Sequence, residues 1–337
     1  MDSSSAGPNP GLIHQLALAY RSSAVFFTAS DLGVFTHIAS GARTAADIAA
    51  RCGAALEPLR MVLETCADIG ILKRDGDGFA NTPTAETFLV KGQRAYLGDS
   101  LKYARDLYPA WGALTDLVTT GHPTMPPDTI MGDDKAKTRA FVMAMHERAK
   151  GIGSVLPHNV NLAGRKKLLD VGGGPGTYAV ELCRQTPGLT ATVLDRPGVL
   201  EVTRELVDAA GFSDRVTLLP GDYLKTPFGS GFDAALLSGM MHRENADNVN
   251  LLLKKTFDAM LPGGQIMVSD VFFDDDRKNT PPFTTSFALN MMLTSDHGSA
   301  HAKTEMARWM EANGFRNITM NEMPRPNPHT LILGIKP

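Results

Sequence analysis

Residues 166–197 read KKLLDVGGGPGTYAVELCRQTPGLTATVLDRP, and this stretch decides the fold. It begins with a short apolar strand, and a glycine-dense turn from Gly172 to Gly176 follows. A helical segment and a second, β-branched strand come next, and the carboxylate of Asp195 ends that strand. Glycines let the backbone turn sharply and approach a ligand, and a helix start offers unpaired N–H groups. An acidic residue about 20 positions further on can accept hydrogen bonds from both ribose hydroxyls. The stretch therefore predicts a nucleoside-binding βαβ unit.

Two classes of cofactor fit the glycine turn. Residues 174–179, GPGTYA, satisfy the G-x-G-x-x-A form of the dinucleotide fingerprint, which leaves an NAD-dependent oxidoreductase open. The spacing of Gly172, Gly174 and Gly176 after Asp170 is instead typical of S-adenosylmethionine (SAM) methyltransferases. The glycines alone do not decide between the two.

The composition is that of an ordinary globular protein. The chain has 337 residues, of which 43% are hydrophobic and 20% charged, with a formal net charge of −3. This length predicts about two domains, and the charge balance gives no footprint for nucleic acid or an anionic membrane. The three cysteines lack metal spacing, and the sequence contains neither a signal-peptide pattern nor an apolar run of about 18 residues. We expect a soluble, cytoplasmic protein with no nucleic-acid or membrane partner.

The N-terminal part predicts a winged-helix arrangement. An apolar helical pattern covers residues 12–40, and two further helices are expected at 44–50 and 57–69. Two short strands then flank the turn residues 75–78, DGDG, and form a hairpin.

A winged helix suggests DNA binding, but the charges argue against it. Residues 41–90 contain five Lys and Arg against seven Asp and Glu. The second helix, which would enter the major groove, offers Arg60 between Glu57 and Glu64. We expect this module to contact protein, and a ligand-sensing DNA-binding regulator remains a rival interpretation.

From residue 166 onwards, predicted strands alternate with helices. Such alternation predicts an α/β domain with a mostly parallel, seven-stranded sheet and helices on both faces. The expected strands are 166–171, 190–195, 216–220, 232–240, 264–273, 316–323 and 330–336. A long loop containing a helix-like run is expected between the fifth strand and a helix at 303–312.

Further motifs follow the glycine turn in a fixed order. They are Asp195, then GDYL at 221–224, then LPGG at 261–264. With the N-terminal module and WGALTDLVTTGHP at 111–123, they make the chain from about residue 12 onwards resemble the small-molecule O-methyltransferase family. Plant caffeate and bacterial secondary-metabolite enzymes typify that family. The resemblance implies SAM as cofactor, S-adenosylhomocysteine as product, a small hydroxylated aromatic substrate and a homodimer.

The resemblance also implies how the chain is divided. Residues 1–100 would form a winged-helix dimerisation domain, and residues 101–160 a helical linker that contributes to the substrate pocket. Residues 161–337 would form a Rossmann-like SAM-binding domain.

The resemblance assigns the cofactor site to the glycine turn and the strand ends. The three glycines would pass under the methionine and ribose parts of SAM, and the acid after the second strand would hold the ribose hydroxyls. The two residues after the third strand would bracket the adenine, and Ser238 stands where many relatives carry Lys or Arg. The expected cofactor-binding residues are Gly172, Gly174, Gly176, Asp195, Asp222, Tyr223 and Ser238.

Substrate contacts are expected from the linker helix and from the helix-like run. Paired methionines suit a flexible apolar wall for an aromatic ring, although core filling is an equal alternative. The expected substrate-binding residues are Met143, His146, Asn290 and Met291.

The resemblance places the catalytic base at His242, at the edge of the fourth strand. A phenol of pKa about 10 facing an imidazole near 6.5 is a feasible proton transfer. Asp270 falls on the first of two glutamates that relatives use around the base, and is one methylene shorter. The second maps near residues 300–302, which hold no carboxylate, and His301 is a candidate for part of its role. Relatives also follow the base with Asp-Trp, whereas residues 243–244 are Arg-Glu.

These departures leave a second chemistry open. A SAM-binding relative that performs C- or N-methylation, or a SAM-assisted hydroxylation, would also lack the second carboxylate. We predict no metal site, because the acidic run Asp274 to Asp276 has no neighbouring His and is followed by Arg277 and Lys278.

Overall fold

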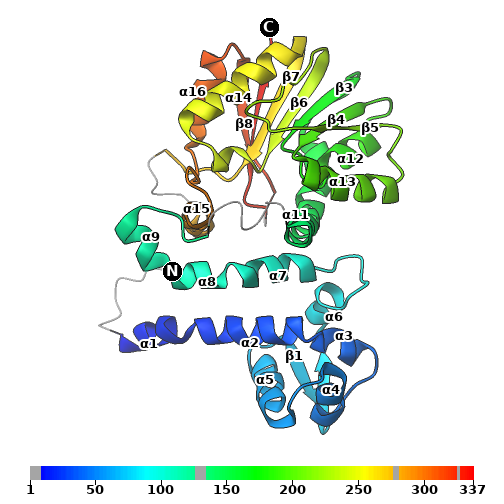
Figure 1. Cartoon of the computed structure of the whole chain (residues 1–337), viewed down its shortest axis with the longest axis vertical. Coiled ribbons are helices and arrows are strands. Elements are labelled where there is room, and N and C mark those ends of the chain that lie inside the picture. The colour runs from blue at the N-terminus through cyan, green and yellow to red at the C-terminus, as the bar shows by residue number, and fades with distance from the viewer. Residues whose placement is uncertain (1–8, 126–133, 276–280, 325–326) are drawn as a thin grey trace. The chain divides into compact units, whose positions relative to one another are not determined.

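The computed structural model describes residues 9–125, 134–275, 281–324 and 327–337. Asp276, the last residue of the acidic run, and the Arg277 and Lys278 that follow it lie outside these residues. The chain forms two compact units, Met1–Arg105 and Asp106–Pro337 (Figure 1). Within the described residues, no helix combines the length and apolarity that a membrane crossing needs.

The first unit is helical with one small hairpin, as the sequence predicts. Its elements are α1 Pro10–Leu18, α2 Tyr20–Asp31, α3 Val34–Ala39, α4 Ala45–Cys52, α5 Leu56–Asp68, β1 Leu72–Asp75, β2 Gly78–Asn81, α6 Pro83–Phe88 and α7 Gly98–Asp106. The Thr44 hydroxyl caps α4 by accepting from the Asp47 N–H at 3.1 Å, and the Asp47 carboxylate accepts from the Thr44 N–H at 3.4 Å. In the turn that joins β1 to β2, Gly76 takes a φ of +56°, which glycine adopts readily. The core of this unit gathers the buried side chains of α3, α4, α5 and the hairpin.

The second unit is built on a seven-stranded sheet of order β5-β4-β3-β6-β7-β9-β8 (Figure 1). Its strands are β3 Lys167–Val171, β4 Thr190–Asp195, β5 Val216–Pro220, β6 Phe232–Ser238, β7 Met260–Asp270, β8 Arg316–Glu322 and β9 Thr330–Ile335. Only β9 runs against its neighbours, so the sheet is mostly parallel. The chain starts at the centre with β3, builds outward through β4 and β5, and then returns to add β6 on the other side of β3. Such a reversal leaves a crevice at the carboxyl ends of the central strands, where doubly wound sheets bind ligands.

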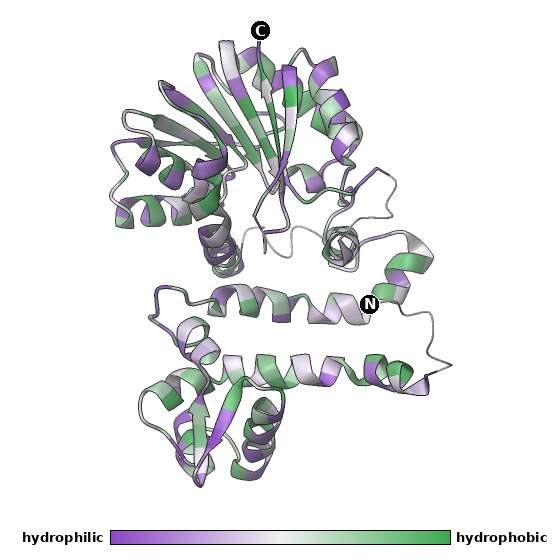
Figure 2. Cartoon of the chain, turned by 180° about the vertical axis from the view of Figure 1, so that it is seen from behind, coloured by the Kyte–Doolittle hydropathy of each residue, from purple (hydrophilic) through white to green (hydrophobic). Residues whose placement is uncertain are grey.

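Helices cover both faces of this sheet, with α12 and α13 over one core and α14 and α16 over the other. The helices of this unit are α8 Tyr108–Gly112, α9 Leu114–Thr120, α11 Lys135–Val155, η1 Leu156–Asn159, α12 Thr177–Gln185, α13 Pro197–Ala209, η2 Met241–Arg243, α14 Ala246–Ala259, α15 Pro282–Thr294 and α16 Lys303–Ala312. Along β3, Leu168 packs with the core under α12 and α13, and Leu169 packs with the core under α14 and α16. The central strands are therefore apolar on both faces, and Figure 2 shows green, hydrophobic segments along the strands of the sheet.

Most predicted strand ends agree with the structure to within two residues, and the fifth strand differs most. It spans Met260–Asp270 rather than 264–273, and its first residue pairs with Phe232 across a register shift. The helix-like run expected in the long loop before α16 is a full helix, α15, over Pro282–Thr294. Its sequence, PFTTSFALNMMLT, is apolar around most of the helix and lacks the periodic pattern that identifies a helix.

Candidate active site

The glycine turn joins β3 to α12 in the backbone geometry that the sequence predicts. Gly172, Gly174 and Gly176 have φ values of +63°, +51° and +70°, a region that other residues rarely adopt. The turn also packs closely, because a Cβ on Gly173 would lie 2.7 Å from the carboxyl carbon of Asp170. A bulkier sequence would therefore not fit this turn.

The carboxylate of Asp195 lies beside the turn. Its Oδ2 accepts from the Gly174 N–H at 2.8 Å, and its Oδ1 accepts from the Arg196 N–H at 2.7 Å. Burial raises the pKa of Asp195, and these two N–H groups partly offset that effect. Each carboxylate oxygen can accept more than one hydrogen bond, so Asp195 retains acceptor capacity for hydroxyl groups of a ligand.

A second carboxyl, that of Asp170, lies fully buried beneath the turn. Neither of its oxygens has a hydrogen-bond partner among the described residues. Burial, and then the negative charge of Asp195, raise the pKa of Asp170 to about 7. A buried carboxyl without a partner is unfavourable, and a cationic or hydrogen-donating ligand group would relieve it. The sequence analysis placed Asp170 at the strand end but gave it no role.

The residues after β5 are fixed by side-chain hydrogen bonds. Asp222 Oδ1 accepts from the Leu224 N–H at 2.9 Å. The Tyr223 hydroxyl donates to Glu244 Oε1 at 2.6 Å, and Asn248 Nδ2 donates to Glu244 Oε2 at 2.7 Å. Burial and the adjacent Glu244 carboxylate raise the pKa of Tyr223. Glu244, which stands where relatives carry Trp, is therefore the hydrogen-bond partner of Tyr223. This contact could not be predicted from the sequence.

His242 and Asp270 form a buried pair at the ends of β6 and β7. His242 Nδ1 lies 2.7 Å from Asp270 Oδ1, and the two residues are 8% and 1% exposed. The backbone N–H of His242 donates to Asp270 Oδ2 at 3.3 Å, and the Val271 N–H donates to Oδ1 at 2.8 Å. Burial opposes ionisation of Asp270, but His242, with smaller effects of His329 and the Val271 N–H, lowers its pKa below the ordinary value. The ionised Asp270 keeps the imidazole proton on Nδ1 and leaves Nε2 as an acceptor.

His301 contacts backbone rather than the ring of His242. Its Nε2 lies 3.1 Å from the carbonyl oxygens of both Met241 and Glu244. Its ring meets that of Trp309 edge-on, with centroids 5.0 Å apart. His301 thus occupies the neighbourhood of the missing carboxylate with a different set of contacts.

The predicted substrate residues of α15 lie on the helix that contacts the His242 turn. Asn290 Oδ1 accepts from the Trp111 indole N–H at 3.0 Å, and Met291 is 5% exposed. On the same helix, the Phe287 ring meets the His242 ring edge-on at 4.8 Å. Phe287 belongs to the helix-like run from which substrate contacts are expected, and core filling was its alternative. Trp111 had no role as a single residue in the prediction, because its contact depends on helix packing.

The predicted residues of α11 lie elsewhere in the unit. Met143 packs with the small core between α11 and α13. His146 Nδ1 lies 2.8 Å from the Thr177 hydroxyl, at the first residue of α12. Burial, and then Lys150, lower the pKa of His146 to about 4, so the ring is neutral at physiological pH. The structure therefore brings His146 to the glycine turn, and not to the His242–Asp270 pair.

Ser238 ends β6, is 8% exposed, and lies near the hydroxyl of Tyr178. Burial raises the pKa of Tyr178, so this hydroxyl keeps its proton. The two hydroxyl groups add neutral polar atoms to the carboxyl edge of the sheet.

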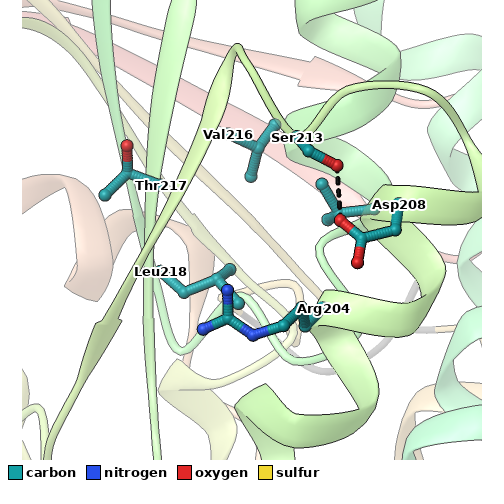
Figure 3. Close-up of a pocket in the computed structure, with 7 residues that line it drawn as sticks. Arg204, Asp208, Ser213, Val216, Thr217 and Leu218 are labelled. Carbon is teal, nitrogen blue, oxygen red and sulfur yellow. Dashed lines mark hydrogen bonds between the residues drawn. The ribbon is translucent and has the colours of Figure 1, made fainter.

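The pocket in Figure 3 is separate from the predicted site residues. It has a volume of about 290 Å³ and lies between α13 and the first residues of β5. The Ser213 hydroxyl donates to the Asp208 carboxylate in its wall. The lining residues are Arg204, Val207, Asp208, Ser213, Val216, Thr217 and Leu218. None of the predicted site residues lines it, and it does not lie at the carboxyl ends of the strands.

Comparison with protein families gives two matches along the chain. Residues 14–91 match the O-methyltransferase dimerisation domain, and residues 111–316 match the O-methyltransferase domain.

Curated relatives and solved structures match over nearly the whole length. The chain is 30% identical over 331 residues to 3-hydroxy-5-methyl-1-naphthoate 3-O-methyltransferase of Streptomyces sahachiroi, covering 97% of this chain and 95% of the relative. It is 27% identical over 338 residues to the N,N-dimethyltransferase OxyT of Streptomyces rimosus, covering 96% and 95%. Human N-acetylserotonin methyltransferase, solved in complex with SAM, matches with a TM-score of 0.89 at 25% identity, covering 99% of each chain.

The unpartnered Asp170 predicts a pH-dependent affinity for S-adenosylhomocysteine, whose ammonium group is cationic. Binding next to Asp170 favours the carboxylate, so lowering the pH from about 8 to about 6 should weaken binding by up to about 10-fold. Asp170→Asn should bind more weakly at the higher pH and lose this dependence. Calorimetric titration at both pH values measures it, with the exposed Asp214→Asn as a control of equal charge change.

Asp170→Asn should weaken ligand binding but should stabilise the fold of the free protein relative to wild type as the pH rises. The pKa of Asp170 is raised from 3.8, so its ionisation costs folding stability as the pH rises towards 7. The Tm of Asp170→Asn relative to wild type should therefore increase between about pH 5 and pH 8. An unchanged difference would show that Asp170 titrates normally.

Proposed function

The chain belongs to the SAM-dependent O-methyltransferase family, and from this premise we propose that it methylates a hydroxyl of a small aromatic molecule, with His242 as the general base. The family's cofactor, SAM, replaces the NAD that the glycine turn left open. The observation that carries the proposal is the buried His242–Asp270 pair at the carboxyl edge of the sheet.

The pair is suited to removing a proton from a hydroxyl. Asp270 holds the imidazole by Nδ1, so that Nε2 accepts the substrate proton and Asp270 then stabilises the imidazolium. When bound, the cofactor supplies an electrophilic methyl carbon on a cationic sulfur. The protein's own task is to align the nucleophile and to hold its proton, and a buried pair fixed by several hydrogen bonds favours both.

The residues of the sheet edge fit this cofactor. We propose that the glycine turn (Gly172, Gly174 and Gly176) runs beneath its methionine and ribose parts, and that Asp195 accepts from the ribose hydroxyls. The fixed carboxylate of Asp195, 2.8 Å from the Gly174 N–H, supports this assignment. The unpartnered Asp170 fits an ammonium group.

The other proposed cofactor contacts follow β5 and β6. Asp222 and Tyr223 are assigned to the adenine, supported by the hydrogen bond that fixes the Tyr223 hydroxyl on Glu244. Ser238, at the end of β6, is assigned to the polar edge of the same site.

Aromatic side chains next to the base favour an aromatic substrate. The rings of Phe283 and Phe287 are stacked, with centroids 5.9 Å apart and planes at 27°, and Phe287 also contacts His242. Asn290 and Met291 belong to the same helix, and we assign both to the substrate site. Met143 and His146 remain proposed substrate residues of α11, although their described contacts are with α13 and α12.

We also propose that the protein is a homodimer formed through the first unit, residues 1–100 in our division, with 101–160 as the linker and 161–337 as the catalytic domain. The support is the dimerisation-domain match and the apolar surface of α1, none of whose residues is buried in the single chain. Leu12, Ile13 and Leu16 on this helix are 55%, 69% and 67% exposed. A second copy would cover them.

A second candidate is methyl transfer to nitrogen. The similarity to an N,N-dimethyltransferase favours it, as does the absence of a carboxylate at residues 300–302. An amine also needs less help from a base than a phenol does.

The two candidates differ in their acceptor. With SAM as donor, 3-hydroxy-1-naphthoate and other phenols should gain a methyl group, and 3-amino-1-naphthoate should not. Mass spectrometry of the products measures this. Methylation of the amine alone would favour the second candidate, and no methylation across a panel of phenols would contradict the proposal.

Replacement of the base tests the mechanism. His242→Ala should lower kcat on a phenol by about 100-fold or more, because the hydroxyl loses its proton acceptor. The dissociation constant of S-adenosylhomocysteine should change little. His297→Ala, on an exposed histidine of the nearby loop, is the matched control. An unchanged rate would remove His242 from the mechanism.

A charge on α1 tests the dimer. Ile13→Asp should shift the protein from dimer towards monomer in sedimentation velocity, because it buries an unpaired charge in the proposed interface. Thr84→Asp places the same charge on the exposed surface of α6 and should leave the dimer intact. A wild-type monomer would contradict the proposal directly.

A further inference from the structure

The turn that carries His242 is held on both sides by one side chain. His301 Nε2 lies 3.1 Å from the carbonyl oxygen of Met241 and 3.1 Å from that of Glu244. Both partners are acceptors, so Nε2 carries the proton and shares it between them. One imidazole thus connects the residue before the base to the residue two positions after it.

The carbonyls of the two residues between Met241 and Glu244 are also bound, by the segment of residues 295–301 that contains His301. The Ser299 N–H donates to the carbonyl of His242 at 2.8 Å. The Ser295 hydroxyl donates to the carbonyl of Arg243 at 3.4 Å. Segment 295–301 therefore binds four consecutive carbonyls, and His301 supplies two of these contacts.

His301 is itself firmly placed. Its carbonyl accepts from the Phe273 N–H at 2.9 Å, which ties it to the chain just after β7. Its ring meets Trp309 of α16 edge-on at 5.0 Å, and its side chain is 12% exposed. The segment is therefore anchored to the same strand end that supplies Asp270.

Among the described residues, the ring of His242 is held by one hydrogen bond, from Nδ1 to Asp270, and by an edge-on contact with Phe287. With one carboxylate on the ring, the direction in which Nε2 points depends on where the backbone places His242. The turn itself is short, three residues of 3₁₀ helix, and short turns leave carbonyls that need outside partners.

We propose that His301 is a positioning residue, which orients the base by holding the carbonyls of Met241 and Glu244 with its Nε2–H. The inference rests on the proposed role of His242. His301 acts on the backbone and supplements the single carboxylate, so it does not take part in proton transfer.

A pair of variants separates the hydrogen bond from the ring. His301→Phe keeps a ring against Trp309 and removes the donor, whereas His301→Gln keeps a donor at the position of Nε2 and removes the ring. We expect His301→Phe to lower kcat on a phenol by about 10-fold or more, with the affinity for S-adenosylhomocysteine changed by less than about 3-fold. His301→Gln should recover most of the rate. Trp309→Leu, which removes the ring contact but leaves the donor, should lower the rate less than His301→Phe does.

A second measurement does not require a substrate that accepts the methyl group. With histidine-selective isotope labelling and bound S-adenosylhomocysteine, the Nδ1–H of His242 should give a low-field NMR signal from its hydrogen bond to Asp270. We expect this signal to be broadened or lost in His301→Phe and retained in His301→Gln. An unchanged signal and rate in folded His301→Phe, checked by its Tm, would overturn the inference.

The two proposals fail differently. If His242→Ala retains full activity on a phenol, the base assignment fails, whatever His301 does. If His242→Ala is inactive and His301→Phe is fully active, the base assignment stands and the positioning role is wrong. An acceptor that is already ionised, a nitro-substituted hydroxynaphthoate, gives a third comparison. It should be much less sensitive to His301→Phe than the phenol, and equal sensitivity would indicate general damage to the site.

Discussion

The parallel pairing of β3 with β4 on one side and β6 on the other is the constraint from which the site follows. The register sets Val171 opposite both Leu194 and Leu237, so the three strands end level with one another. The glycine turn, Asp195 and Ser238 follow at these three ends, and β7 adds Asp270 beside them. Apolar packing on both faces holds the strands in this register, because each buried side chain is fitted to the helices on its own face. The chemistry at the edge therefore depends on hydrophobic cores that contain none of its polar groups.

Two buried aspartates at that edge show how strongly local partners decide the behaviour of one residue type. Asp170 and Asp270 are 0% and 1% exposed. Asp170 is the last residue but one of β3, and Asp270 is the last residue of β7, with β6 between the two strands. Asp270 faces His242 and backbone N–H groups, so its pKa is lowered. Asp170 has no partner among the described residues and faces the charge of Asp195, so its pKa rises to about 7. Asp270 therefore has its partners within the protein, whereas Asp170 is suited to a positive charge that a ligand brings.

Much of this architecture could be predicted from the sequence because its signals are local. The glycine turn, the acid at Asp195 and the alternation of strands and helices depend on short spacings that a backbone must satisfy. The hydrogen bonds of His301 to Met241 and Glu244, and the pairing of Tyr223 with Glu244, join residues 21 or more positions apart, and no spacing rule encodes them. Helix α15 could be expected only as a helix-like run without bounds, since a helix that is apolar around most of its surface has no periodic signal. His146 was placed on the right helix, but the direction of its side chain was set by the packing of α11 against α12.

The hydrogen bond between Tyr223 and Glu244 restricts which substitutions are tolerated at these two positions. Tryptophan at position 244, as in relatives, would remove the acceptor and leave a buried tyrosine hydroxyl without its partner. Phenylalanine at 223 would remove a donor from a glutamate that is 7% exposed, leaving Asn248 as its remaining side-chain partner among the described residues. Each single change passes through a less stable intermediate, so the two positions are expected to be exchanged together or not at all. Because Glu244 also belongs to the turn that carries His242, a substitution at Tyr223 is expected to alter the position of that turn as well.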